Sequence, residues 1–141
     1  MPRLQSMTTQ PSPLFSPISD ADANERVAAV YADIRHTRNT DHINNFWRVV
    51  ANDPDQLERT WEEVKTVMAP GILDALTKDL IYIAVSVAHG CQYCIRSHTA
   101  SARTKGATDE HFRELHAVIA AASRTNRLAT GLQIPIDEAN L

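Results

Sequence analysis

The residues best suited to chemistry are the two cysteines of the chain, Cys91 and Cys94, which follow directly after Gly90. A Cys-x-x-Cys pair at the start of a helix can hold reactive thiols, because unpaired backbone N–H groups and the positive end of the helix dipole favour a thiolate. His98 follows Cys94 by four positions. A helix over this segment would therefore place both thiols and the imidazole on one face, which predicts a redox or proton-transfer site.

Both cysteines are expected in the first turn of that helix, and their spacing limits how they pair. Side chains three positions apart in a helix have Cβ atoms about 5–6 Å apart, whereas a disulfide needs about 3.5–4.5 Å. We expect the disulfide to form with an adjusted first turn, to be strained and to be easily reduced. Such a bond suits a cycling site better than a structural staple.

Asp79 is the acid that the predicted helices bring close to this pair. We expect an apolar, central and most buried helix from Leu73 to His89, then a tight turn at Gly90. Asp79 lies eleven positions before Gly90 and His98 eight positions after it, so their axial offset is about 4–5 Å at 1.5 Å per residue. A contact, direct or through one water, would let Asp79 orient His98 while His98 moves the thiol proton.

The other apolar residues recur with the helical period and predict an all-α fold of about six helices. The first expected helix begins near Ser19–Asp20, the second covers Ile43 to Val50, and the third runs from Pro54 to before Pro70. The fourth covers Leu73 to His89, the fifth runs from about Cys91 to Lys105, and the sixth runs from a Thr108 cap to about Asn126. An extended tail is expected from Arg127. No strand alternation and no internal repeat is found in the sequence.

Composition bounds the organisation and the partners. Residues 1–18 contain four prolines among Ser, Thr and Gln and are expected to be a flexible arm, and residues 19–141 to be one helical domain. The net charge of −3 comes from 14 basic and 17 acidic residues and favours neither a nucleic acid nor a membrane as partner. Without an apolar span or a secretion signal, we expect a cytoplasmic protein.

Other roles for the cysteine pair are weaker. A zinc site would draw three ligands from one helix and has no second pair at finger spacing. Haem attachment needs a histidine where Ile95 follows Cys94, and a thioredoxin fold needs a βαβ pattern. Two inert buried cysteines, and an Asp79 that only pairs structurally with a lysine, are the remaining alternatives.

The order of Asp79, Cys91, Cys94 and His98, on an apolar helix that ends in His-Gly, resembles the core motif of the AhpD-like alkylhydroperoxidases within the carboxymuconolactone decarboxylase superfamily. The strong similarity spans about Leu73 to Glu110, and weaker similarity extends over most of the chain after the arm. The resemblance implies an all-helical domain with a central helical hairpin and a homo-oligomer, commonly a trimer or hexamer.

The resemblance also implies an activity. Cys91 and Cys94 match the redox pair that reduces a hydroperoxide and passes through a disulfide, while His98 and Asp79 match the histidine and acid of the proton relay. The implied peroxidase of antioxidant defence uses no bound cofactor or metal and takes electrons from a dithiol or a thioredoxin-like reductant. The acid is usually Glu in the family, and the founding type has His where this chain has Tyr93.

Two questions stay open at this level. The helix dipole favours Cys91 as the attacking thiol, whereas the neighbouring His98 and the resemblance favour Cys94. The alternative functions are the decarboxylase or lactone chemistry of the wider superfamily, which needs no redox thiols, and a redox-sensing assembly module.

Overall fold

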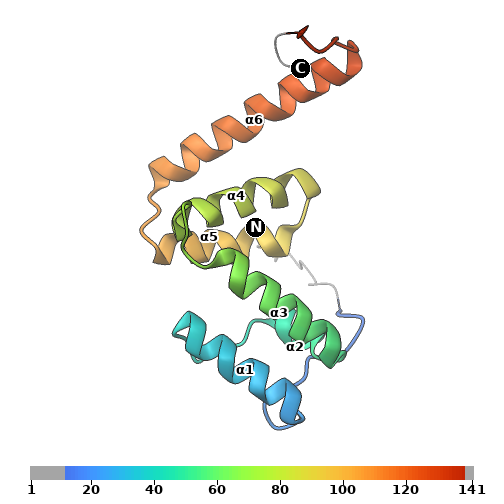
Figure 1. Ribbon diagram of the computed structural model, residues 1–141, viewed down its shortest axis with the longest axis vertical. Helices are drawn as coiled ribbons and strands as arrows, with labels where there is room; N and C mark the ends of the chain where they lie inside the picture. Colours follow the sequence, from blue (N-terminus) through green and yellow to red (C-terminus); the bar gives the residue numbers. More distant parts are fainter. Residues whose placement is uncertain (1–11, 139–141) are drawn as a thin grey trace, which may run out of the picture. The chain divides into compact units, whose positions relative to one another are not determined.

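A computed structural model describes residues 12–138, in which the chain forms six helices and no strand (Figure 1). The helices are α1 (Glu25–Arg38), α2 (Asn45–Val50), α3 (Pro54–Met68), α4 (Ala75–His89), α5 (Gln92–Thr104) and α6 (Asp109–Gly131). The predicted all-α class with about six helices is confirmed. Residues 1–11 of the expected arm lie outside the described residues. Within residues 12–138, no helix is both long and apolar enough to cross a bilayer.

The first of two compact units ends at Val67 and contains α1, α2 and nearly all of α3. Its core consists of buried apolar residues from these three helices and from the segments that flank α2: Val27, Val30, Tyr31, Ile34, Ile43, Trp47, Ala51, Leu57 and Trp61. The start of α3 is as predicted, with Pro54 as first residue and the Asp53 carboxylate accepting the Gln56 backbone N–H at 3.1 Å. Local sequence signals thus determine this unit closely.

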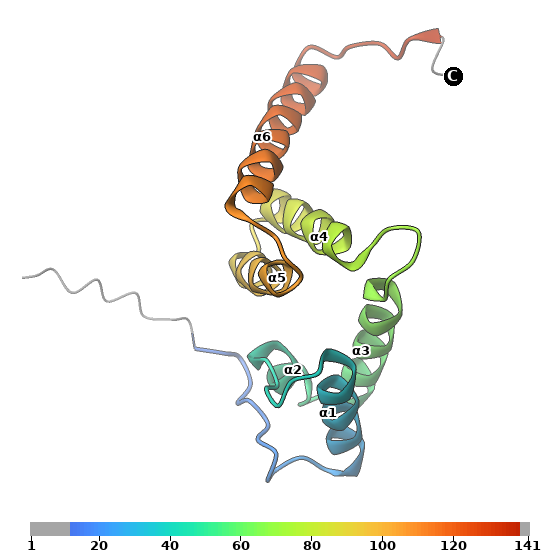
Figure 2. The same cartoon turned by 90° about the vertical axis from the view of Figure 1, so that its left-hand side faces the viewer.

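The second unit begins at Met68 and contains α4, α5 and α6. Here α4 and α5 lie side by side as a hairpin (Figure 2), and α6 also packs against α4. The core consists of Ile83, Ala102 and Ala107, with partly buried Leu76, Leu80, Val87, Phe112 and Leu115 packed around it.

The apolar arc of α4 is only partly covered within one chain. Ile83 is fully buried, but Ile81 and Val85 are 48% and 52% exposed. α5 and α6 both pack against α4, but they leave these two side chains half exposed. The expectation that α4 is the most buried helix of the chain is therefore not met by the single chain.

The last helix is longer than predicted. α6 follows Thr108 as expected but continues to Gly131, five residues beyond the predicted end at Asn126. The segment from Arg127 to Thr130 contains no glycine or proline, so no local signal stops the helix before Gly131. The expected extended tail from Arg127 is wrong for these residues.

Candidate active site

The turn between α4 and α5 lets the two helices pack side by side as a hairpin. Gly90 adopts a left-handed conformation with φ of 70°, which a residue with a side chain rarely takes, and its N–H caps the end of α4 by donating to the carbonyl oxygens of Ser86 and Val87. The Cys91 N–H then donates to the Ser86 carbonyl oxygen at 2.9 Å. The chain reverses within two residues, as the hairpin prediction requires.

Cys91 and Cys94 form a disulfide at the start of α5, with Cα atoms 5.4 Å apart. Cys91 lies one position before the helix as its N-cap, with φ of −81° and ψ of 89°, and its Sγ accepts the Cys94 backbone N–H at 3.3 Å. The prediction that both cysteines lie inside the first turn is thus wrong for Cys91. Its non-helical backbone is the adjustment that lets the two side chains meet.

Asp79 lies on the α5-facing side of α4 and is 1% exposed. Its Oδ1 is 2.9 Å from Nδ1 of His98. Its Oδ2 accepts the Ser101 hydroxyl at 2.8 Å and also an N–H of the Lys105 ammonium group. The Asp79–His98 contact expected from the hairpin is therefore present and direct.

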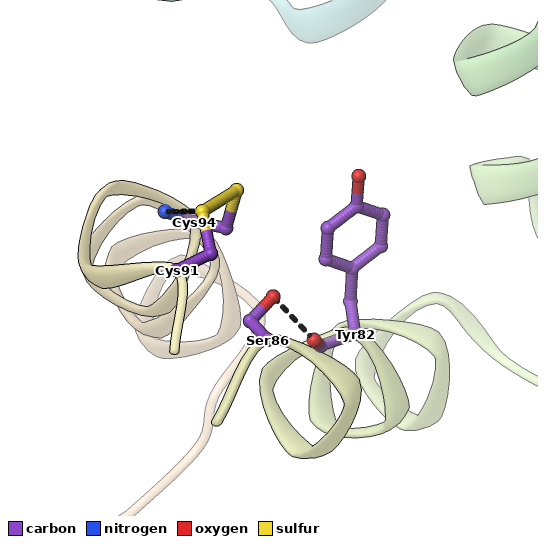
Figure 3. The surroundings of a disulfide bond; sticks show 4 residues. All are labelled: Tyr82, Ser86, Cys91 and Cys94. Carbon is purple, nitrogen blue, oxygen red and sulfur yellow. Dashed lines mark hydrogen bonds between the residues drawn. A yellow bond between two sulfur atoms is a disulfide. The ribbon is translucent and has the colours of Figure 1, made fainter. Parts of the chain in front are cut away.

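His98 is held in one orientation from two directions. Because an ionised carboxylate only accepts hydrogen bonds, the contact with Asp79 assigns a proton to Nδ1 and leaves Nε2 as the basic nitrogen of the neutral ring. The ring also stacks on Tyr82, with centroids 3.7 Å apart and planes at 22°. Figure 3 shows the Tyr82 ring and the disulfide on the same side of the hairpin.

Ser101, Lys105 and the stacking of Tyr82 were not predicted from the sequence. Cys94, His98, Ser101 and Lys105 follow one another at steps of four, three and four. This spacing keeps them on one face of α5 and was the available signal. The alternative that Asp79 pairs with a lysine is also realised, since Asp79 binds Lys105 and His98 at the same time.

The charge state of Asp79 follows from its contacts. Burial alone raises the pKa of Asp79, but hydrogen bonds from His98, Lys105 and Ser101, together with the charge of Lys105, lower it below its ordinary value of 3.8. The carboxylate is therefore ionised at neutral pH although it is buried.

Asp79 is expected to make the protein labile to acid. Because the pKa of Asp79 is lower in the folded than in the unfolded chain, its contribution to the free energy of unfolding is fully present above about pH 4 and is lost as pH falls through the folded value. Asp79→Asn should lower the free energy of unfolding by about 1–3 kcal/mol at pH 7. The free energy of unfolding of this variant should also change less than that of the parent between pH 2 and pH 4. Urea unfolding at pH 2, 4 and 7 measures both differences.

The control for that measurement is Asp137→Asn, which removes a carboxylate from an exposed position. It should follow the parent protein at every pH. An Asp79→Asn variant that loses stability between pH 4 and pH 2 as steeply as the parent contradicts the assignment.

The described residues 12–138 offer no cluster of metal ligands, and a groove in the first unit includes none of the predicted site residues. Among residues 12–138, no group of three or more His, Cys, Asp or Glu side chains is placed to hold a metal ion. A surface groove of about 440 Å³ lies in the first unit, between residues of α1 and α3 such as Arg26, Asp33 and Trp61. It contains none of the predicted site residues.

Comparisons with known proteins agree with one another. The model of the carboxymuconolactone decarboxylase family matches residues 55–137, which include the four predicted site residues. The crystal structure of the alkylhydroperoxidase AhpD core from Rhodospirillum rubrum is 51% identical, with a TM-score of 0.87, and the match covers 89% of this chain and 95% of that one. Uncharacterized protein 4 in the cox locus of Paracoccus denitrificans is 46% identical over 50 residues, or 36% of this chain. That match spans 45% of the curated relative's length.

Proposed function

This chain belongs to the carboxymuconolactone decarboxylase family, and we propose that it is a thiol-dependent peroxidase that reduces alkyl hydroperoxides through a Cys91–Cys94 disulfide cycle. The observation that carries the proposal is the disulfide at the start of α5 on the helix face that also holds His98, whose ring is oriented by a buried carboxylate. The likeness to a protein named alkylhydroperoxidase supports the same reaction.

The chemistry follows from the site. In the reduced protein, His98 Nε2 takes the proton of the attacking thiol, and the thiolate attacks the distal oxygen of the hydroperoxide. The O–O bond breaks, the alcohol leaves with the proton returned by His98, and the attacking cysteine becomes a sulfenic acid. The second thiol attacks this sulfur, water leaves and the disulfide closes. One hydroperoxide is thus reduced to one alcohol and one water at the cost of two thiols.

We assign the attack to Cys94 and the resolving step to Cys91. His98 is one helical turn beyond Cys94, in position to exchange a proton with its sulfur. Cys91 lies at the N-cap, bonded to Cys94 in the disulfide, so its thiol is within reach of a sulfenic acid formed on Cys94.

Partners follow from the same proposal. An external dithiol or a thioredoxin-like protein must reduce the disulfide, since the cycle consumes two electrons per turnover and no bound cofactor is invoked. We propose a homo-oligomer, a trimer or hexamer, in the cytoplasm. The half-exposed Ile81 and Val85 on α4 and Val118 on α6, which is 66% exposed, support burial against a second copy.

The test is a thiol titration of the pre-reduced protein with stoichiometric cumene hydroperoxide, an alkyl hydroperoxide. We expect loss of two thiols per chain, one intramolecular disulfide by mass, and one alcohol per disulfide. Blocking both thiols with iodoacetamide should abolish peroxide reduction. Thiols that survive the peroxide contradict the proposal, and a decarboxylase activity that survives alkylation would favour the other chemistry of the family.

A further inference from the structure

The second oxygen of Asp79 has partners that the relay itself does not use. Oδ1 binds His98, whereas Oδ2 receives both the Ser101 hydroxyl and the Lys105 ammonium group. Lys105 also donates to the Ser101 Oγ at 2.8 Å. His98 and Ser101 from α5 and Lys105 at its C-cap thus surround one carboxylate from α4. The lysine reaches the acid directly and also through the Ser101 hydroxyl.

This arrangement decides how the buried charges balance. An ionised Asp79 beside a neutral His98 would leave one uncompensated negative charge in a site where the acid is 1% exposed, which is costly. Lys105 supplies the compensating positive charge. With Lys105 in place, the charge of the buried Asp79 is balanced while the imidazole ring of His98 is unprotonated. Without Lys105, a second proton on His98 would balance the charge of Asp79.

We propose that Lys105 is a positioning residue that neutralises Asp79, holds it with Ser101 in the orientation that His98 requires, and thereby keeps the imidazole free to accept a proton. In the peroxidase cycle this free nitrogen is the base for the Cys94 thiol, so the catalytic consequence rests on the proposed function. The contact geometry and the charge balance stand without it.

The other ionisable groups around the network are few. Tyr82 from α4 stacks on the His98 ring, and Cys94 lies one turn before His98 on α5. No hydrogen bond or ion pair from α6 reaches Asp79 or His98 in the part of the chain that the structure describes. Lys105 is therefore the cation in direct contact with Asp79 besides any protonated form of His98.

Solvent limits how strongly the charge of Lys105 acts on the protonation of His98. The Lys105 side chain is 35% exposed, so water screens part of its charge. A unit charge acting over about 5 Å at an effective dielectric constant near 20 shifts a protonation equilibrium by more than tenfold, and screening brings the expectation to about tenfold. This change is large enough to measure on a single histidine.

The experiment is ¹⁵N NMR of the histidine rings in the oxidised protein, with the His98 signals assigned by their loss in His98→Gln. In Lys105→Met, the ratio of doubly protonated to neutral His98 at a fixed pH should rise about tenfold. Lys105→Arg, which keeps the charge, should restore the ratio of the parent. Arg96→Met removes the same charge from an exposed site on the same helix and should leave the ratio unchanged.

The outcomes separate this inference from the proposed function. If the His98 ratio moves in Lys105→Met and recovers in Lys105→Arg, the positioning role holds even where no form of the protein reduces peroxide. If the ratio stays within twofold of the parent while Lys105→Met remains folded by circular dichroism, the role is overturned, whatever the peroxidase activity. Should Lys105→Met not fold, Lys105→Gln provides the same measurement with a polar side chain that can still reach Ser101.

Discussion

Replacing Cys94 with serine should lower peroxide reduction by about a thousandfold or more, to the background of the uncatalysed reaction. The serine hydroxyl stays protonated at neutral pH and cannot form the sulfenic acid that the cycle requires. The substitution changes one atom at a partly buried position in the first turn of α5, so the fold should persist. Peroxide consumption with dithiothreitol as reductant measures the effect.

Cys91→Ser is the matched control, since it makes the same change at the other sulfur. After removal of the dithiothreitol it should still react with one equivalent of peroxide and then stop at a sulfenic acid, which dimedone traps on Cys94. A Cys94→Ser protein that forms the trapped sulfenic acid on Cys91 would reverse the assignment. Full turnover by Cys94→Ser would remove the cysteine pair from the mechanism.

Helix starts could be predicted from the sequence because their signals are local. Asp53 followed by Pro54 fixes the beginning of α3, and Gly90 ends α4 in the left-handed conformation that glycine permits. The end of α6 was missed since no breaker precedes Gly131. Local signals could also not show that Ile81 and Val85 stay half exposed, because a helical wheel gives the direction of a side chain but not what packs against it.

The site could be predicted as far as rigid helix geometry reaches. The rise per residue and a tight turn were enough to pair Asp79 with His98, and the structure has that pair at 2.9 Å. Lys105 was missed because its four-carbon side chain can reach several partners from one backbone position, so spacing alone does not choose Asp79 for it. The N-cap position of Cys91 was missed because sequence does not separate the last turn residue from the first helical one.

Asp79 stands where the family resemblance leads us to expect a glutamate. Asp79 reaches His98 directly although its side chain is one methylene shorter, because α4 and α5 lie side by side over this stretch. The short carboxylate also brings its second oxygen to Ser101 and Lys105. The network that fixes the acid is thus built mainly from α5, the helix at whose start the disulfide lies.

Replacing His98 with glutamine should lower the peroxidase rate by about 10²- to 10⁴-fold, the range that a positioned general acid–base contributes. Glutamine can still donate a hydrogen bond to Asp79, so the buried carboxylate keeps a partner and the free energy of unfolding should change by only about 1 kcal/mol. Its amide nitrogen cannot accept a proton from a thiol. The rate should therefore also lose the pH dependence that His98 provides, which a kcat/KM profile between pH 5 and 9 measures.

His89→Gln is the matched control, because it makes the same substitution at an exposed histidine at the end of α4. It should keep the parent rate and pH profile. If His98→Gln also keeps the parent rate and pH profile, the Asp79–His98 pair serves only to join α4 to α5, and the thiol chemistry proceeds without a base from α5. If His98→Gln alone loses the rate and flattens the profile, the imidazole transfers the proton, since Gln preserves the contact with Asp79 and removes only the basic nitrogen.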